Sequence, residues 1–190
     1  MKKIDARGLD CPKPVIKTKN AIEKYDEIEV LVDNETASKN VKKLGIKMGA
    51  KVSVVKENDN YYKLLLSDYK KTNKTNKNKN QGRVIFVKSE FLGTGEQQLG
   101  DILIKGFIKT LLEINPLPDK IIFINSGVKL PSTNDDVINS LKKLKDNGVE
   151  ILSCGTCLDY YNLTDQLKVG NVSNMYEIVE SLNNGNVLEI

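Results

Sequence analysis

The residue types in this sequence that could do chemistry are its three cysteines, Cys11, Cys154 and Cys157. The chain of 190 residues contains no histidine. That absence excludes a Ser-His-Asp triad, a Cys-His dyad and a histidine metal site. Any reaction must therefore depend on cysteine, carboxylate, lysine, tyrosine or backbone groups. Thiols with a lowered pKa are the first candidates.

Cys11 lies in a sequence typical of the junction between a strand and a helix. Pro12 and Pro14 follow it, and proline is tolerated in the first helical turn, where amide groups have no acceptor. We therefore expect Cys11 at or near the N-cap, where backbone donors and the positive helix end favour a thiolate. Arg7 and Lys13 could add to this effect. A buried structural thiol fits the spacing equally well.

Cys154 and Cys157 form a Cys-x-x-Cys pair that encloses Gly155 and Thr156. The pair is compatible with a thioredoxin-like redox site, half of a zinc site, or a persulfide carrier with a resolving thiol. With three thiols and no histidine, we expect no metal and no cofactor. Cys157 is expected to open a short helix, and Cys154 to lie nearer the strand and be less exposed. Asp159, Tyr160 and Tyr161 could shape the entrance of the site, and the two tyrosines are interpreted as packing rather than catalytic residues.

A second group of candidates lies in loops that could wall the thiol pair. Gly93 and Gly95 precede a predicted helix but match neither nucleotide motif, because Gln98 replaces a third glycine and no P-loop lysine follows. A tight turn is the simpler interpretation. Ser126 or Lys129, from the loop after the neighbouring strand, could line the same pocket.

Composition and charge limit the class of protein. A hydrophobic fraction of 39% and a charged fraction of 28% are ordinary for a soluble globular protein. No apolar run approaches the ~18 residues of a membrane span, and residues 1–5 lack a signal-peptide core. The odd number of cysteines favours reduced thiols. We therefore expect a cytoplasmic protein that does not contact membranes.

The net charge of +4 arises largely from one segment, residues 69–82, which holds five lysines and no acid. We expect this segment to be a flexible linker, because it cannot bury a core. Fourteen such residues would span roughly 20 Å. A nucleic-acid or acidic-partner arm is the alternative, but we do not expect it to bind nucleic acid, because charge runs are usually solvated.

The periodicity predicts a fold of class α/β with two domains, residues 1–68 and 83–190, on either side of the linker. The first domain is expected to be an α+β two-layer sandwich of two helices on a four-stranded sheet. Its predicted strands are 2–6, 28–32, 51–57 and 61–66. Its predicted helices are 12–25 and a second one that is capped at Asn34 or Thr36 and ends at Gly49.

The second domain is expected to be an α/β domain with a mostly parallel sheet, because strands and helices alternate. A helix over 97–114 should bury one face, and Ser173 should cap the last helix. Ligand sites in such sheets lie beyond the carboxyl ends of the strands. That rule indicates the loops 89–96, 125–131 and 153–161. The predicted strands are 83–88, 120–125, 149–153 and 186–190, and the predicted buried face is Leu99, Ile102, Leu103, Phe107, Leu111 and Ile114.

Two stretches resemble known families. Residues 5–14, DARGLDCPKP, resemble the Cys-Pro-x-Pro signature of the TusA (SirA-like) sulfur-carrier family, and residues 1–67 match the order of elements in that fold. Residues 83–190 resemble the DsrE-like family in the stretches FLGTGEQQLG, INSGVKL and CGTCLDYYNL. The combination resembles YedF-type two-domain proteins, which are described as sulfurtransferase-like and are linked to selenium metabolism.

The resemblance implies that Cys11 carries sulfane sulfur, or selenium, as a persulfide-type atom and relays it to Cys157 or Cys154. It implies a cysteine desulfurase or selenocysteine lyase-type donor, a downstream acceptor protein, and homo-oligomers formed through the DsrE-like domain. Two alternatives remain open from the residues. One is a non-catalytic regulatory module that binds a partner or RNA, and the other is a Cys-x-x-Cys dithiol redox protein.

Overall fold

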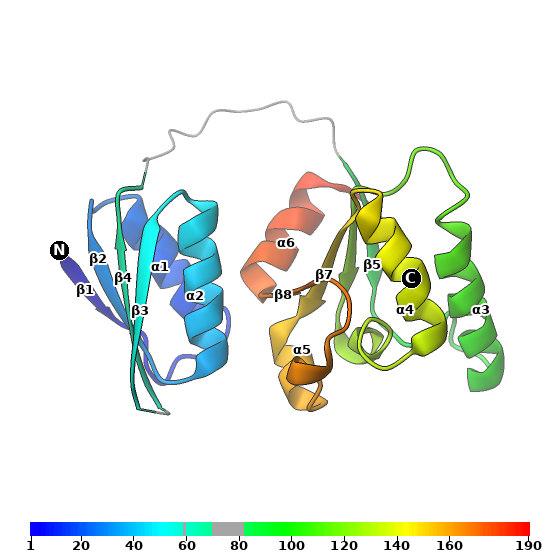
Figure 1. The fold of residues 1–190 in the computed structure, drawn as a ribbon, viewed down its shortest axis with the longest axis horizontal. Helices are drawn as coiled ribbons and strands as arrows, with labels where there is room; N and C mark the ends of the chain where they lie inside the picture. The colour runs from blue at the N-terminus through cyan, green and yellow to red at the C-terminus, as the bar shows by residue number, and fades with distance from the viewer. Residues whose placement is uncertain (59, 70–81) are drawn as a thin grey trace. The chain divides into compact units, whose positions relative to one another are not determined.

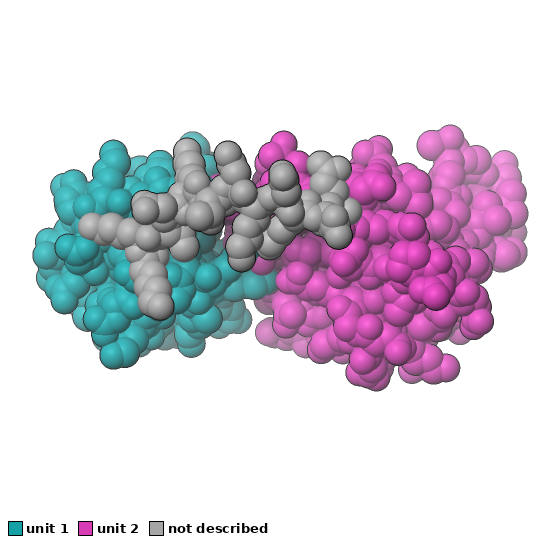
Figure 2. All heavy atoms as spheres, turned by 90° about the horizontal axis from the view of Figure 1, so that it is seen from above, with its two compact units in different colours: residues 1–78 teal, residues 79–190 magenta. Residues whose placement is uncertain are grey.

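The computed structural model describes residues 1–58, 60–69 and 82–190. The chain divides into two compact units, residues 1–78 and 79–190 (Figure 2). Most of the predicted linker and basic arm, residues 70–81, lies outside the described residues. Tyr69, at the start of that segment, packs against the core of the first unit, and its hydroxyl donates to the carbonyl of Tyr25.

The first unit is the predicted two-layer sandwich, with both helices on one face of a four-stranded sheet (Figure 1). The strand order is β1-β2-β4-β3; β1 and β2 are parallel, and the other pairs are antiparallel. Its elements are β1 (Lys2–Asp5), α1 (Lys13–Ile22), β2 (Ile28–Val32), α2 (Glu35–Lys47), β3 (Lys51–Asn58) and β4 (Tyr61–Ser67).

The core of this unit is built from alternate apolar residues of β2 and β4, although Leu31 of β2 is also buried. The apolar residues of β2 that face the helices pair with apolar residues of β4, for example Val30 with Leu64. The predicted cap of α2 is confirmed, because the Asn34 side chain accepts a hydrogen bond from the Ala37 amide at 2.8 Å. Each of these three elements, β2, β4 and α2, therefore has a local signal.

The second unit has a five-stranded sheet in which every pair is parallel, in the order β8-β7-β6-β5-β9. Helices α3 and α4 cover one face and α6 covers the other (Figure 1). Its elements are β5 (Arg83–Val87), α3 (Gln97–Thr110), β6 (Lys120–Phe123), η1 (Asn125–Lys129), α4 (Asp135–Asp146), β7 (Glu150–Cys154), α5 (Gly155–Tyr160), η2 (Thr164–Gln166), β8 (Asn171–Ser173), α6 (Met175–Asn184) and β9 (Asn186–Glu189).

One prediction for this unit is wrong at the last helix, and the strand before that helix is missed. The cap of α6 is Asn174, whose side chain accepts from the Glu177 amide at 3.1 Å, and not Ser173. Ser173 instead ends β8, a strand that the sequence does not predict. With three residues, β8 is too short to show an alternating pattern.

The predicted buried face of α3, the first helix of the second unit, is wrong in its N-terminal half. Leu99, Ile102 and Leu103 are 54%, 65% and 44% exposed, whereas Ile104 and Ile108 are fully buried. Apolar residues occupy several faces of α3, so periodicity does not select one. The selection comes from Gly100, where an added Cβ would lie 2.9 Å from the Cβ of Phe91.

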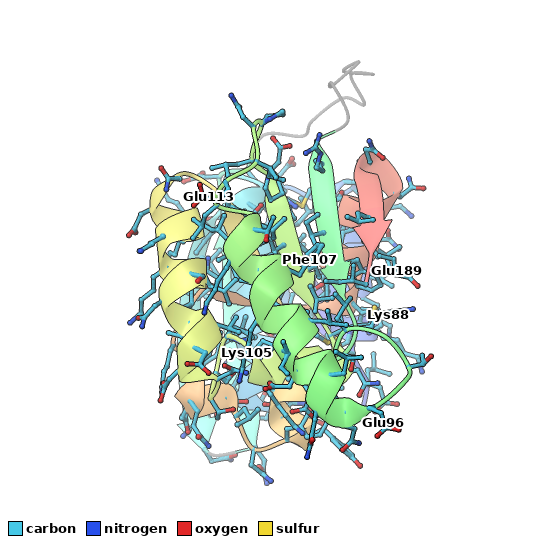
Figure 3. All side chains as sticks on the ribbon, turned by 90° about the vertical axis from the view of Figure 1, so that its right-hand side faces the viewer. Lys88, Glu96, Lys105, Phe107, Glu113 and Glu189 are labelled. Atoms are coloured by element: carbon cyan, nitrogen blue, oxygen red, sulfur yellow. The ribbon has the colours of Figure 1, made fainter. Side chains whose placement is uncertain are left out.

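This close approach at Gly100 turns the residues four and eight positions later toward the sheet. The helix also ends earlier than predicted, at Thr110. On its C-terminal half, Phe107 packs against the core (Figure 3). Among the residues that the structure describes, no helix combines the length and the apolar character needed to cross a membrane.

Candidate functional site

The three loops singled out at the carboxyl edge of the second sheet meet in the structure. The Glu90 amide donates to Ser126 Oγ at 3.2 Å, and Lys129 Nζ lies 2.6 Å from Glu90 Oε1. The Asn125 amide donates to Cys157 Sγ at 3.1 Å. Loop 89–96 is therefore joined to loop 125–131, and loop 125–131 to the cysteine pair.

The close contact between these loops depends on parallel register and on one glycine. Strands β6 and β7 pair Phe123 with Ser153, so both strands deliver their following loops to the same edge. The η1 turn then lies against the end of β5. A Cβ on Gly127 would be 2.8 Å from the carbonyl oxygen of Val87, so only glycine permits this approach without a shift.

The two thiols of the pair have different environments. Cys154 is the N-cap residue of α5 and is 1% exposed, within an apolar cluster that includes Ile178 of α6. Cys157 is partly buried. The helix begins at the buried Gly155 rather than at Cys157, so Cys157 lies within the first turn. Thr156 is exposed. The lower exposure predicted for Cys154 agrees with these positions.

Hydrogen bonds favour the thiolate of Cys157. The Cys154 thiol and the Asn125 amide both donate to its sulfur, and together they lower its pKa from an ordinary value of 9.0 to about 6, against the opposing effect of burial. At neutral pH about nine-tenths of this thiol is then ionised. Cys157 is therefore the charged, nucleophilic member of the pair.

Two residues contribute to this site in a way that the sequence does not predict. Asn125 has a left-handed backbone with a φ of 50°, and its side-chain oxygen accepts a hydrogen bond from the Tyr161 hydroxyl at 3.1 Å. Lys129 Nζ lies 5.0 Å from the centre of the Tyr161 ring. The available signals were an asparagine directly after a strand and a tyrosine four residues after Cys157 on the same helical face.

The glycine loop has a more limited role than the thiol pair. Gly93 has a φ of 89°, which favours glycine, and a Cβ at Gly93 or Gly95 would meet nothing within 4 Å. The loop is tied to α3 by a hydrogen bond from the Leu92 amide to the Gly100 carbonyl at 3.0 Å. This geometry fits a tight turn. Among the described residues, no group of three or more metal-ligating side chains is arranged to hold a metal ion.

The first unit presents Cys11 in a different way. Cys11 is exposed and lies one residue before Pro12, the N-cap of α1, and the peptide bond between them is cis. The buried Pro14 occupies the first turn, and its carbonyl accepts from Thr18 Oγ1 at 2.8 Å. The predicted position near the start of the helix is therefore observed.

The side chain of Arg7 does not act as a free cation beside this thiol. Its guanidinium donates two hydrogen bonds to Asp5, at 2.9 and 2.6 Å, and lies 5.4 Å from the centre of the Tyr61 ring. These bonds lower the pKa of Asp5 to about 2. Arg7 therefore has structural partners that the sequence does not predict, and they fix the chain just before the Cys11 turn.

Comparisons with known proteins divide at the same boundary as the structure. A family model described as "Sulfurtransferase TusA" matches residues 2–67, and one described as "DsrE/DsrF-like family" matches residues 106–189. A Methanocaldococcus jannaschii protein named "Putative sulfur carrier protein" is 35% identical over 69 residues, which are 35% of this chain and 92% of that protein.

Solved structures show similarity to each unit. A SirA-like protein from Desulfitobacterium hafniense is 28% identical and matches 37% of this chain and 100% of its own, with a TM-score of 0.35. The ychN protein from E. coli is 15% identical and matches 58% of this chain and 99% of its own, with a TM-score of 0.46. The two family models and the M. jannaschii relative show that this chain belongs to the sulfurtransferase TusA family and joins its TusA/SirA-like domain to a DsrE-like domain.

Proposed function

We propose that this protein is a sulfur carrier that holds sulfane sulfur as a persulfide on Cys11 and relays it to Cys157. The observation that carries the proposal is the paired donation to Cys157 Sγ, from the Asn125 amide at 3.1 Å and from the Cys154 thiol. The exposure of Cys11 supports the first part, since a donor protein must reach that sulfur. The relationship to a protein named as a sulfur carrier agrees with this role.

The transfer step is a thiolate exchange that needs no histidine and no external oxidant. The Cys157 thiolate attacks the outer sulfur of the Cys11 persulfide, a new S–S bond forms on Cys157, and the old S–S bond breaks. Cys11 leaves as a thiolate, and the outer sulfur keeps its proton. One thiolate and one persulfide are present before and after the step.

Cys154 supplies a route for release. Its thiolate attacks the inner sulfur of the Cys157 persulfide, which forms the Cys154–Cys157 disulfide and expels hydrosulfide. The sulfane sulfur is reduced as the two thiols are oxidised, so a cellular dithiol reductant must then restore the pair. Burial of Cys154 protects it from other reactants and leaves Cys157 as its nearest partner.

The donor that we propose is a cysteine desulfurase, and the acceptor is a downstream protein thiol. A selenocysteine lyase-type donor with selenium as cargo follows from the resemblance to YedF-type proteins, because the same exchange operates with either element. We propose the cytoplasm as the location, since the mechanism needs reduced thiols.

Mass spectrometry tests the order of transfer. The reduced full chain is incubated with a cysteine desulfurase and labelled cysteine, and adducts of about 32 Da are located by digestion. In the Cys11→Ser chain, loading of Cys157 should fall at least tenfold, while Cys157→Ser should leave the Cys11 adduct intact. Normal loading of Cys157 without Cys11 would contradict the order. A parallel reaction with selenocysteine lyase, read as an adduct of about 80 Da, tests the cargo.

A second candidate function is a dithiol redox protein, and the contact between Cys154 and Cys157 favours it. This function predicts reversible disulfide formation with a reduction potential in the range of known oxidoreductases and no persulfide adduct after donor treatment.

We also propose that the second unit forms homo-oligomers. Leu99, Ile102 and Leu103 on α3 and Val187 and Leu188 on the edge strand β9 are exposed apolar residues, and together they are more than scattered surface side chains. Sedimentation of the full chain should show a species larger than a monomer, and Ile102→Lys should shift it toward the monomer.

A further inference from the structure

We infer that Tyr161 is a positioning residue for the proposed carrier thiol, because its hydroxyl fixes Asn125 in the conformation that directs an amide at Cys157. The inference rests on the proposed function only in taking Cys157 as the carrier.

The geometry is a closed ring of three hydrogen bonds. The Asn125 amide donates to Cys157 Sγ at 3.1 Å, and the Tyr161 hydroxyl donates to the Asn125 side-chain oxygen at 3.1 Å. The Tyr161 amide donates to the Cys157 carbonyl at 3.1 Å and completes the ring. The ring joins η1 to α5, two segments more than 30 residues apart, so the position of each residue constrains the other two.

The backbone of Asn125 is the adjustable part of this ring. Ile124 is extended, with φ −133° and ψ 170°, and the chain then turns into the left-handed region at Asn125, with a φ of 50°. The direction of the Asn125 N–H depends on the ψ of Ile124 and the φ of Asn125. Asparagine tolerates this region better than most residues but does not require it. A tertiary contact to its side chain therefore selects the conformation.

The Tyr161 ring is held from two sides. Lys129 Nζ lies 5.0 Å from the ring centre and is itself paired with Glu90 at 2.6 Å. The Tyr160 ring packs edge-on, with 5.1 Å between the ring centres. These contacts keep the hydroxyl in place over Asn125. Through Tyr161 and Asn125, they also connect Lys129 and Glu90 of the neighbouring loops to the thiol.

Several titratable groups lie around Cys157, and the test must separate them. The Cys154 thiol donates to it from the same turn, Lys129 and Glu90 lie behind Tyr161, and Asp159 on α5 accepts from Thr164 Oγ1 at 2.6 Å. Tyr161→Phe leaves all four groups in place and keeps the ring under Lys129. The substitution removes only the hydroxyl and therefore reports on the bond to Asn125.

The experiment measures the pH dependence of iodoacetamide alkylation at Cys157 in the reduced full chain, with the label assigned by peptide mass spectrometry. We expect Tyr161→Phe to raise the pKa of Cys157 by about 0.5 to 1. At pH 6 this slows alkylation about two- to fivefold. The matched control is Tyr160→Phe, at an adjacent tyrosine that is 79% exposed, and it should leave the pKa unchanged.

A double-mutant cycle tests the route through Asn125. Asn125→Gly keeps the amide and tolerates the left-handed backbone but lacks the side-chain oxygen, so adding Tyr161→Phe to it should change the pKa no further. An unchanged pKa in Tyr161→Phe alone, or an equal rise in both backgrounds, overturns the inference. If the expected shifts occur but no variant takes up persulfide, the positioning role stands and the carrier function fails.

Discussion

The two thiol regions of this molecule differ in the exposure of the cysteine and in how far its surroundings control the reactivity of the thiol. Cys11 is exposed, before the first turn of α1, in a loop that Arg7 and Asp5 brace from the side. Cys157 is partly buried, receives two hydrogen bonds on its sulfur and lies among three loops. In the proposed relay, the open thiol serves delivery and the enclosed thiol serves retention.

The largest expected effect comes from removing the enclosed thiol. Cys157→Ser should abolish persulfide on the second unit and leave the Cys11 adduct unchanged, because the remaining thiol of the pair, Cys154, is only 1% exposed. Peptide mass spectrometry after donor treatment measures both adducts. Persistent loading of Cys154 in this variant would remove the distinction between the two thiols of the pair.

The second effect concerns the pH dependence of alkylation at Cys157. With a pKa of about 6, its alkylation rate should fall roughly tenfold between pH 7 and pH 5, as the thiolate fraction falls. Because the folded pKa lies below the ordinary value of 9.0, the contribution of this thiol to stability is present above pH 9 and is lost as the pH falls through 6.

Cys154→Ala tests the cause of the lowered pKa of Cys157. Loss of the donated hydrogen bond should raise the pKa of Cys157 and move the fall in rate to higher pH. An alkylation profile that is the same in both chains would show that the Cys154 contact does not lower the pKa.

The third effect concerns the close approach of η1 to β5. Gly127→Ala places a Cβ 2.8 Å from the Val87 carbonyl oxygen and should destabilise the second unit by about 1–3 kcal/mol. Gly106→Ala, at a helix position where a Cβ meets nothing within 4 Å, should stabilise it by about 0.5–1 kcal/mol. Urea unfolding followed by circular dichroism measures the free energy of unfolding of both variants. An unchanged free energy in Gly127→Ala would show that the loop shifts at little cost.

The smallest effect compares the helix caps of the two units. Asn34→Ala should cost the first unit about 1 kcal/mol, because the cap bond to Ala37 is 2.8 Å long. Asn134→Ala should cost the second unit less, since its bond to Val137 is 3.3 Å long. Neither change should alter alkylation of Cys157. A larger loss for Asn134→Ala would mean that bond length does not rank these caps.

Features with a local signal could be predicted from the sequence. The cap at Asn34, the alternation on β2 and β4, and the helix start after Cys11 each depend on residues within a few positions of one another. The grouping of the three loops followed from the rule that parallel strands end at one edge. That rule needs only the order of the elements.

Features that depend on distant contacts could not be predicted. The buried face of α3 is selected by Gly100 against Phe91, and the left-handed Asn125 is held by Tyr161, 36 residues away. Neither contact has a periodic signature. The thiol motif could therefore be found from the sequence, whereas the contacts that set its ionisation could not.

The parallel sheet of the second unit has a consequence for the length of the segment that joins the two units, residues 70–81. Gly82 leads into β5 at the amino edge of the sheet, whereas Cys157 follows the carboxyl end of β7. Strand β5 has five residues and spans roughly 17 Å. A relay within one chain must carry sulfur from Cys11 past the height of β5 to Cys157. The twelve residues 70–81 can extend at most about 40 Å. Deletion of half of residues 70–81 would reduce this reach to about 20 Å, close to the height of β5 alone, so transfer within one chain should slow and transfer between chains, whose rate depends on protein concentration, should take a larger share.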